Sequence, residues 1–321
     1  MAASDEHYKQ ILGAVRAVTS VNFSNYRETT IKRRIVRRMA LQNQQSMADY
    51  ARRLAQDASE VDALYRDLLI NVTSFFRDPE VFDYLKHEVF PRIIEGKAVG
   101  APVRLWVPGC STGQEAYSLA IILWKFFDDR PVRPPIQIFA SDMADTVLFE
   151  KARAGLFPAS IEAELEPGRL RRFFKKEDHL YRIDKSIRDS CVFARHNVMA
   201  DAPFSRLDLI SCRNLLIYLD PLAQKQVLSA FHYALNVPGF LVLGTAESVS
   251  GNADYFALID RDHRIYKKNP VISHPPMFLP RQDNTISIDT TPRTSSPVGL
   301  SADYQVRADR LLLAVMRLLV C

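Results

Sequence analysis

A glycine turn followed by a helical pattern is the feature of this sequence with the clearest chemical use. The stretch at 103–118, VRLWVPGCSTGQEAYS, begins as an apolar run and passes through Gly109 and Gly113. From Ala116 onwards apolar residues recur three or four apart, which predicts a helix. A strand, a glycine turn and a helix form the cofactor-binding unit of doubly wound α/β sheets, because glycines let backbone N–H groups approach a ligand closely. The stretch therefore predicts a nucleotide-like cofactor, with a plain tight turn as the alternative.

An acid at the end of the next predicted strand is a second candidate. The run IQIFA at 136–140 is apolar, and Ser141 and Asp142 follow it. In a doubly wound sheet an acid at this position accepts both ribose hydroxyls of a cofactor. The alternative is that Asp142 caps the helix that begins near Ala144. The glycine turn upstream favours the ribose role.

The segment at 31–39, IKRRIVRRM, carries the strongest charge pattern. On a helix, Ile31, Ile35 and Met39 share one face. Arg33, Arg34, Arg37 and Arg38 share another face, and Lys32 flanks them. With no acid between them they repel one another, which favours an anionic partner, either nucleic acid or an acidic protein surface. A solvated helix face is the alternative, and the scarcity of aromatic residues disfavours stacking on single-stranded nucleic acid.

Composition bounds the class of protein. The chain has 321 residues, 47% of them hydrophobic, enough for one large domain or two modest ones. No apolar run is long enough to span a bilayer, and the N-terminus does not resemble a signal peptide. The four cysteines show no metal-ligand spacing, so we expect neither a metal site nor a disulfide framework. We expect a cytoplasmic protein, whose uneven net charge of +5 suggests an acidic partner.

Two kinds of element must position these residues. Residues 1–94 are predicted to be helical, with Asp78 capping a helix that begins at Pro79. Residues 95–102 form a linker to a sheet domain at 103–268. Within that domain, about 155–190 departs from simple alternation and predicts an inserted antiparallel element.

The end of the predicted sheet narrows the fold class. Two strand patterns, 256–259 and 264–267, flank a turn and indicate a hairpin at the sheet edge. Parallel strands that end in such a hairpin are the architecture of class I methyltransferases, a Rossmann-like doubly wound fold, rather than of dehydrogenases. Residues 269–302 are rich in Pro, Ser and Thr and are predicted to be a disordered linker. Residues 303–321 are predicted to be an apolar helix, which either docks on the body or begins a further domain.

Five motifs follow one another along most of residues 10–268. They are NVTSFFRD (71–78), PGCSTGQEAYS (108–118), FASD (139–142), ISCRNLLIYLD (210–220) and LGTAES (243–248). Together they resemble the chemotaxis receptor glutamate methyltransferases of the CheR type. The resemblance implies a helical N-terminal domain and an S-adenosylmethionine-binding domain with an inserted β-subdomain. It also implies methyl esters on glutamates of the cytoplasmic helical bundle of chemoreceptors, for sensory adaptation, with S-adenosylhomocysteine as the second product.

The resemblance also implies roles for single residues. Arg213 and Asn214 would lie near the methyl group and the incoming carboxylate, and Tyr218 would add a hydroxyl there unless it belongs to the core. Further cofactor contacts would be Asn71, Thr73 and Arg77 at the domain junction, Glu115 at the methionine end, Asp142 at the ribose, and Asn197 and Val198 beside the adenine. The basic helix, with Lys32, Arg33, Arg34, Arg37 and Arg38, would bind the acidic receptor bundle.

One segment departs from the family pattern. Members that dock on a receptor's C-terminal pentapeptide carry a glycine-rich loop in the β-subdomain. Here the sequence at 173–183 is FFKKEDHLYRI, which contains no glycine. We therefore expect a monomer that binds receptors through its N-terminal helices, independently of the pentapeptide.

Two other functions compete with this interpretation. A nucleic-acid methyltransferase would suit the basic charge, but the DAPF segment at 201–204 precedes the fourth strand, whereas the corresponding motif follows it. Cys212 lacks the preceding proline expected of a cysteine that attacks cytosine. We therefore expect no nucleic-acid partner and no membrane insertion. A non-enzymatic adaptor that binds the cofactor as a signal is the third class, and the intact motifs disfavour it.

Overall fold

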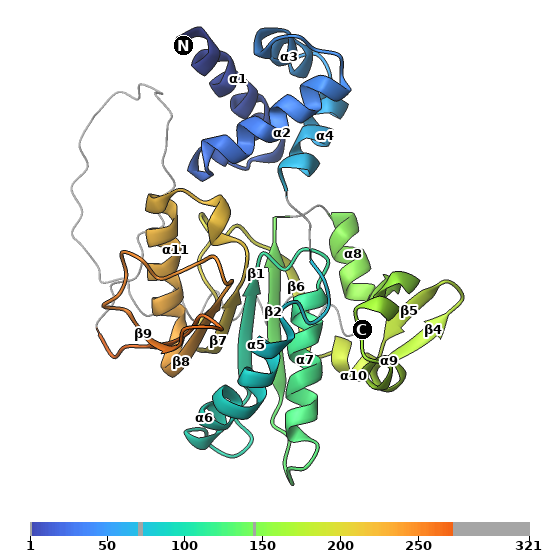
Figure 1. Cartoon of the computed structure of the whole chain (residues 1–321), viewed down its shortest axis with the longest axis vertical. Helices are drawn as coiled ribbons and strands as arrows, with labels where there is room; N and C mark the ends of the chain where they lie inside the picture. Colours follow the sequence, from blue (N-terminus) through green and yellow to red (C-terminus); the bar gives the residue numbers. More distant parts are fainter. Residues whose placement is uncertain (1, 70–72, 144–145, 272–321) are drawn as a thin grey trace, which may run out of the picture. The chain divides into compact units, whose positions relative to one another are not determined.

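Seven strands form the main sheet, in the order β6-β2-β1-β7-β8-β10-β9 (Figure 1). The computed structural model describes residues 2–69, 73–143 and 146–271, so Asn71 and the segments predicted for 272–321 lie outside the described residues. The strands are β1 (Val103–Pro108), β2 (Ile136–Asp142), β3 (Leu156–Pro158), β4 (Phe174–Glu177), β5 (Leu180–Ile183), β6 (Cys191–Arg195), β7 (Leu207–Cys212), β8 (Leu235–Leu243), β9 (Phe256–Asp260) and β10 (Ile265–Lys268). The α-helices are α1 (Ala2–Thr19), α2 (Glu28–Leu41), α3 (Met47–Leu54), α4 (Ala58–Leu68), α5 (Pro79–Tyr84), α6 (Phe90–Glu95), α7 (Gln114–Phe127), α8 (Thr146–Ala154), α9 (Pro167–Phe173), α10 (Lys185–Arg188) and α11 (Pro221–Ala234).

The main sheet is parallel except at one end. Strands β6, β2, β1, β7 and β8 pair in parallel, whereas β10 pairs antiparallel with both β8 and β9. Parallel strands covered on both faces require continuous apolar runs, and β7 is buried at every position. The predicted strands and the terminal hairpin are confirmed, and the fold is the Rossmann-like methyltransferase type.

The chain changes its direction across the sheet between β1 and β7. From β1 it passes through α7 to β2 on one side, and from β7 it passes through α11 to β8 on the other. Because such crossovers are right-handed, α7 and α11 cover opposite faces, and Figure 1 shows them on either side of the strands. Ligands of doubly wound sheets bind beside such a reversal, at the carboxyl ends of the strands. The ends of β1 and β7 therefore flank the expected site.

The N-terminal helices α1–α4 pack around a core of their own. Ile31 and Ile35 of α2 are fully buried in it and Met39 packs against it, which confirms the predicted apolar face of that helix. Within the described ranges no helix combines the length and the apolar character needed to cross a bilayer.

A buried carboxylate, Glu60 of α4, ties three helices of this bundle together. It accepts hydrogen bonds from Arg38 Nε at 2.9 Å, from Gln42 Nε2 at 2.8 Å and from the Tyr50 hydroxyl at 2.7 Å. Only 3% of its side chain is exposed, so its charge depends on these donors for stabilisation. Arg38 therefore contributes to the interior of the bundle.

Replacing Glu60 by glutamine is expected to destabilise the bundle by about 2–4 kcal/mol, because Arg38 loses its buried counter-ion. Urea unfolding followed by circular dichroism measures the loss. Glu28→Gln is the matched control, because Glu28 pairs with Lys32 on the surface. An equal loss in both variants would contradict the role of Glu60 as a buried centre.

The junction segment 73–78 leads into a helix that begins at Pro79, with Asp78 at the N-cap position, as predicted, but the Asp78 side chain does not cap it. The carboxylate of Asp78 makes no capping hydrogen bond and instead pairs with Arg213. Its φ of +55°, like the φ of +49° at Phe76, lies in the left-handed region, which is unfavourable for residues other than glycine. Contacts elsewhere must hold this backbone in place.

The predicted insertion is a separate three-stranded antiparallel sheet, in the order β3-β5-β4. It is anchored to the junction segment through Phe75, whose ring meets Phe157 and Phe174 edge to face. The Phe75 N–H also donates to the Glu164 carboxylate at 2.7 Å. The insert therefore helps to fix the segment that carries Thr73 and Arg77.

Candidate active site

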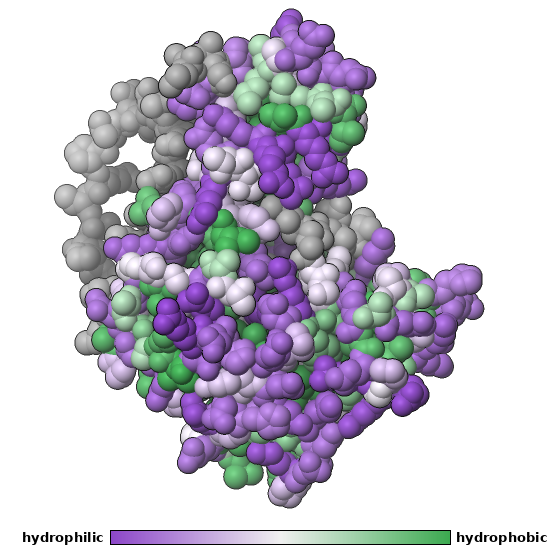
Figure 2. Space-filling view, in the orientation of Figure 1, coloured by the Kyte–Doolittle hydropathy of each residue, from purple (hydrophilic) through white to green (hydrophobic). Residues whose placement is uncertain are grey.

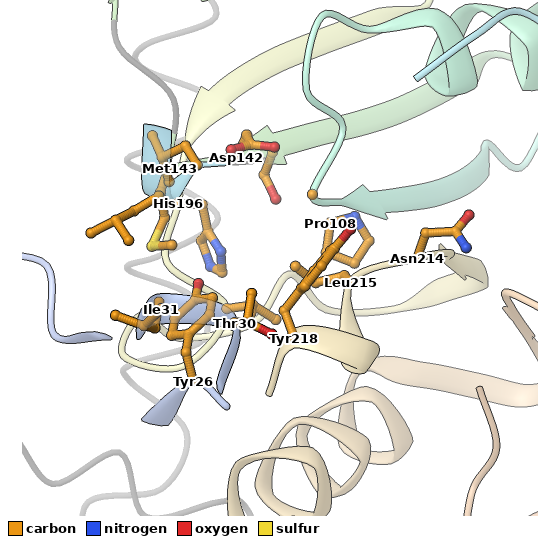
Figure 3. A pocket seen from close by; sticks show the side chains of 15 residues that line it. Tyr26, Thr30, Ile31, Pro108, Asp142, Met143, His196, Asn214, Leu215 and Tyr218 are labelled. Atoms are coloured by element: carbon orange, nitrogen blue, oxygen red, sulfur yellow. The ribbon is translucent and has the colours of Figure 1, made fainter. Parts of the chain in front are cut away.

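A pocket lies at the carboxyl ends of the parallel strands, where the change of direction predicts it (Figure 3). Gly109 and Asp142 line it from the ends of β1 and β2, and Val198 from the loop after β6. Asn214 and Tyr218 line it from the loop after β7. Four of the predicted site residues thus meet in one pocket: Asp142, Val198, Asn214 and Tyr218.

The glycine turn has the geometry that the sequence predicted. Gly109 and Gly113 have φ values of +71° and +93°. A Cβ atom on Gly113 would lie 2.9 Å from the Phe193 ring, so a side chain has no room there. The Ser111 N–H in the same turn donates to the Asp142 carboxylate at 2.8 Å. Asp142 therefore holds the turn and lines the pocket at once.

Replacing Gly113 by alanine is expected to weaken S-adenosylhomocysteine binding and to destabilise the fold by about 1–3 kcal/mol, because alanine is strained at this φ and collides with Phe193. Calorimetric titration and thermal melting measure the two effects. Gly13→Ala in α1 is the control, since nothing lies within 4 Å of its added Cβ. Unchanged cofactor affinity in the Gly113 variant would show that the turn does not shape the site.

A charged cluster lies behind the pocket, around Arg213. Its side chain is 1% exposed, and its Nη2 donates to the Arg77 carbonyl at 2.8 Å and to the Asp78 carboxylate at 2.6 Å. Its Nη1 lies 3.7 Å from Glu115 Oε2, and Glu115 Oε1 accepts from the Ser211 hydroxyl at 2.6 Å. The guanidinium thus joins the junction segment to α7.

This cluster fits the methionine end of the expected cofactor. Burial raises the pKa of the Glu115 carboxyl, while the positive charges of Arg213 and Arg77 partly oppose that rise. A ligand ammonium would supply the counter-charge that Glu115 needs. Within the described residues, Arg213 Nε and Nη1 are buried without a hydrogen-bond partner.

Glu247, in the LGTAES segment, has a role that no single-residue prediction covered. It is 4% exposed and accepts the N–H groups of Gly244, Asn214 and Ile217, at 2.7, 2.9 and 3.2 Å. A Cβ on Gly244 would lie 2.8 Å from this carboxylate. Glu247 thus fixes the loop that presents Asn214, whose φ is +60°. The motif itself was the signal for this residue.

Two family models cover the described chain almost from end to end. The model described as the CheR methyltransferase all-alpha domain matches residues 6–69, and the one described as the CheR methyltransferase SAM binding domain matches residues 71–265. The chain belongs to the CheR methyltransferase family. The matched SAM binding domain confirms the predicted S-adenosylmethionine cofactor, and the family confirms that the chain is of the methyltransferase class.

Three relatives show how far the similarity of this chain extends. It is 39% identical over 273 residues to an uncharacterised 104.1 kDa protein of Rhodobacter capsulatus, covering 85% of this chain and 28% of that one. It is 32% identical to a protein called Cher3 of Pseudomonas putida, covering 83% and 98%. It is also 32% identical to chemotaxis protein methyltransferase 2 of Vibrio cholerae, covering 74% and 84%. The chain therefore spans under a third of the first relative and most of the other two.

The remaining predicted residues lie outside the pocket wall. Arg77, Glu115 and Arg213 form the cluster behind it, and Thr73 is half-buried in the junction segment. Asn197 accepts the Met199 N–H at 3.0 Å and so shapes its own turn beside Val198. The N-terminal region adds wall residues that sequence reasoning missed: Tyr26 just before α2, Thr30 and Ile31 in α2, and Leu68 in α4. These residues are far in sequence from the strand ends that line the same pocket, so no local sequence pattern indicates their place.

Proposed function

We propose that this enzyme methylates glutamate side chains on the cytoplasmic helical bundle of chemoreceptors. The observation that carries the proposal is that α2 borders the pocket with one part of its surface and exposes arginines with another. Thr30 and Ile31 line the pocket, whereas Arg33 and Arg37 on the same helix are exposed. An acidic helix bound to these arginines would lie next to the pocket, and complementary charge would guide it there.

Only part of the basic run is available to such a partner. Lys32 lies 2.5 Å from Glu28 and 3.6 Å from Asp5, and Arg38 is paired with Glu60. Acids outside the run thus pair with Lys32 and Arg38, so these two cations are less available to a partner. Three arginines of the basic run make no ion pair among the described residues. We call them the arginine surface: Arg33, Arg34 and Arg37. In Figure 2 hydrophilic side chains predominate over the N-terminal helices.

The proposed reaction requires alignment rather than proton transfer. A glutamate side chain, with a pKa of about 4.3, is already ionised at neutral pH, so no residue has to act as a base. When bound, S-adenosylmethionine supplies an electrophilic methyl group. Asn214 and Tyr218, in the pocket wall, are the side chains proposed to orient the incoming carboxylate. Arg213 acts behind them as a positioning residue, because its side chain is buried in ion pairs.

The shape of the insert supports receptor binding without a C-terminal pentapeptide. Strands β4 and β5 are joined directly by Asp178 and His179, so no extended glycine loop lies between them. We propose that the enzyme works as a cytoplasmic monomer that reaches its receptors through α2.

Transfer of labelled methyl from S-adenosylmethionine to receptor-containing membranes tests the proposed function. Mild alkali should then release volatile methanol from a membrane protein, because carboxyl esters hydrolyse under these conditions. Receptors truncated by their last five residues should be labelled to the same extent. A receptor in which the methylated glutamates are replaced by alanine is the control and should take up no label.

Three results would contradict the proposal. Label that survives alkali would indicate an N- or C-methyl product and favour the nucleic-acid alternative. Bound cofactor without any transfer would favour the adaptor. Labelling that requires the last five receptor residues would contradict the proposed route while leaving the glutamate chemistry intact.

A further inference from the structure

Tyr26, just before α2, brings a hydroxyl into the pocket that no family motif accounts for. Its ring lines the pocket, and in Figure 3 its hydroxyl points inward, toward His196. Within the described residues this hydroxyl makes no hydrogen bond. Burial, with the nearby Asp142 carboxylate, raises the pKa of Tyr26, so the group stays protonated. It is therefore a neutral donor and acceptor that faces the ligand space.

His196, at the end of β6, lines the same pocket with an unused acceptor. Its Nε2 lies 3.0 Å from the Ala202 carbonyl oxygen, which can only accept, so Nε2 carries the proton. Burial lowers the pKa of the imidazole, which is consequently neutral. Nδ1 is then a bare lone pair, and in the described part of the chain it is buried without a partner. Stacking on Phe204 and an edge contact with Trp106 fix the ring.

We propose that Tyr26 and His196 are two further cofactor-binding residues, which hold the adenosine half of S-adenosylmethionine. Both line the pocket together with Asp142, Met143 and Val198, at the ends of β2 and β6, where doubly wound folds place the nucleoside. Adenosine offers what these atoms lack: hydroxyl and amino donors for Nδ1, and ring nitrogens and hydroxyl oxygens for the tyrosine.

The backbone holds Tyr26 in this place independently of its side chain. Tyr26 forms a β-bridge with Leu219, the Arg27 N–H donates to the Tyr218 carbonyl at 2.8 Å, and the Asp220 N–H donates to the Asn25 carbonyl at 3.0 Å. We call these contacts the backbone seam. Because phenylalanine preserves the seam and the ring, Tyr26→Phe removes the hydroxyl and little else.

Calorimetric titration with two ligands tests the proposal without any methylation assay. S-adenosylhomocysteine carries both halves of the cofactor, whereas 5′-methylthioadenosine lacks the amino-acid end. Tyr26→Phe and His196→Phe are each expected to lower the affinity for both ligands by the same factor. That factor is roughly three- to tenfold, the equivalent of one hydrogen bond. Tyr8→Phe in α1 makes the same one-atom change outside the pocket wall and should change neither affinity.

Three outcomes would overturn the proposal, provided that thermal melting shows each variant folded. Unchanged affinity for both ligands would remove the two residues from the site. Weaker binding of S-adenosylhomocysteine alone would place them at the methionine end. Arg27→Ala removes a side-chain hydrogen bond to the Leu219 carbonyl and leaves the pocket lining intact. If it weakened both ligands as much as Tyr26→Phe, the effect would come from the docking of the helices and not from the hydroxyl.

Discussion

Reversing Arg33 and Arg37 to glutamate is expected to lower kcat/KM for receptor methylation on the order of a hundredfold at low salt, because complementary charge accelerates association by that order. Both side chains are exposed and make no ion pair within the described residues, so their charge is available to the proposed partner. Affinity for S-adenosylhomocysteine should not change, because neither residue lines the pocket.

A matched charge reversal elsewhere in the insertion, in α9 and β4, tests whether the effect depends on the arginine surface or only on net charge. Arg171 and Lys175 are also exposed and, in the described part of the chain, make no ion pair. Arg171→Glu with Lys175→Glu makes the same change in net charge and should leave methylation nearly intact. If both double variants lost activity equally, α2 would have no special role. The loss at α2 should also shrink with added salt, since mobile ions screen exposed charges.

Arg213→Lys is expected to lower kcat about a hundredfold while S-adenosylhomocysteine affinity changes by less than about threefold. The guanidinium donates hydrogen bonds to the Arg77 carbonyl and the Asp78 carboxylate, and it also forms an ion pair with Glu115. A lysine ammonium is a single point and cannot span these groups at once. The junction backbone, left-handed at Phe76 and Asp78, would then relax, and the alignment of the reacting groups would be lost.

Single-turnover kinetics together with calorimetry separate these two effects. Arg172→Lys is the matched control, because Arg172 makes a bidentate pair with Asp128 at 2.7 and 2.8 Å on the surface. That variant should retain its turnover, since surface ion pairs contribute little. If turnover and cofactor affinity fell by the same factor in Arg213→Lys, Arg213 would be a cofactor-binding residue and not a positioning residue.

The elements and the glycine turn could be predicted because their causes are local. Apolar runs such as 105–107 mark buried parallel strands, and the left-handed backbone at Gly109 and Gly113 needs glycine whatever surrounds it. The place of Asp142 in the pocket wall could be predicted because the residue stands at the end of a strand. Each of these signals lies within a few residues of the feature that it predicts.

The contacts that complete the site could not be predicted, because they join distant parts of the chain. Asp78 has the sequence context of a helix cap, yet its partner Arg213 lies 135 positions away. Lys32 and Arg38 belong to one basic run, but acids on other turns and helices neutralise them. Tyr26 follows an unremarkable polar stretch, and only packing against the loop after β7 brings it to the pocket.

The backbone seam has a practical consequence for engineering this enzyme. The hydrogen bonds between residues 25–27 and 218–220 use main-chain N–H and carbonyl groups, which every residue except proline supplies in full. A chimera that takes its first helices from a homologue with another receptor preference would therefore keep this joint without compensating substitutions. If α2 binds the receptor as proposed, receptor specificity could then be exchanged as a module, with the sheet domain left unchanged.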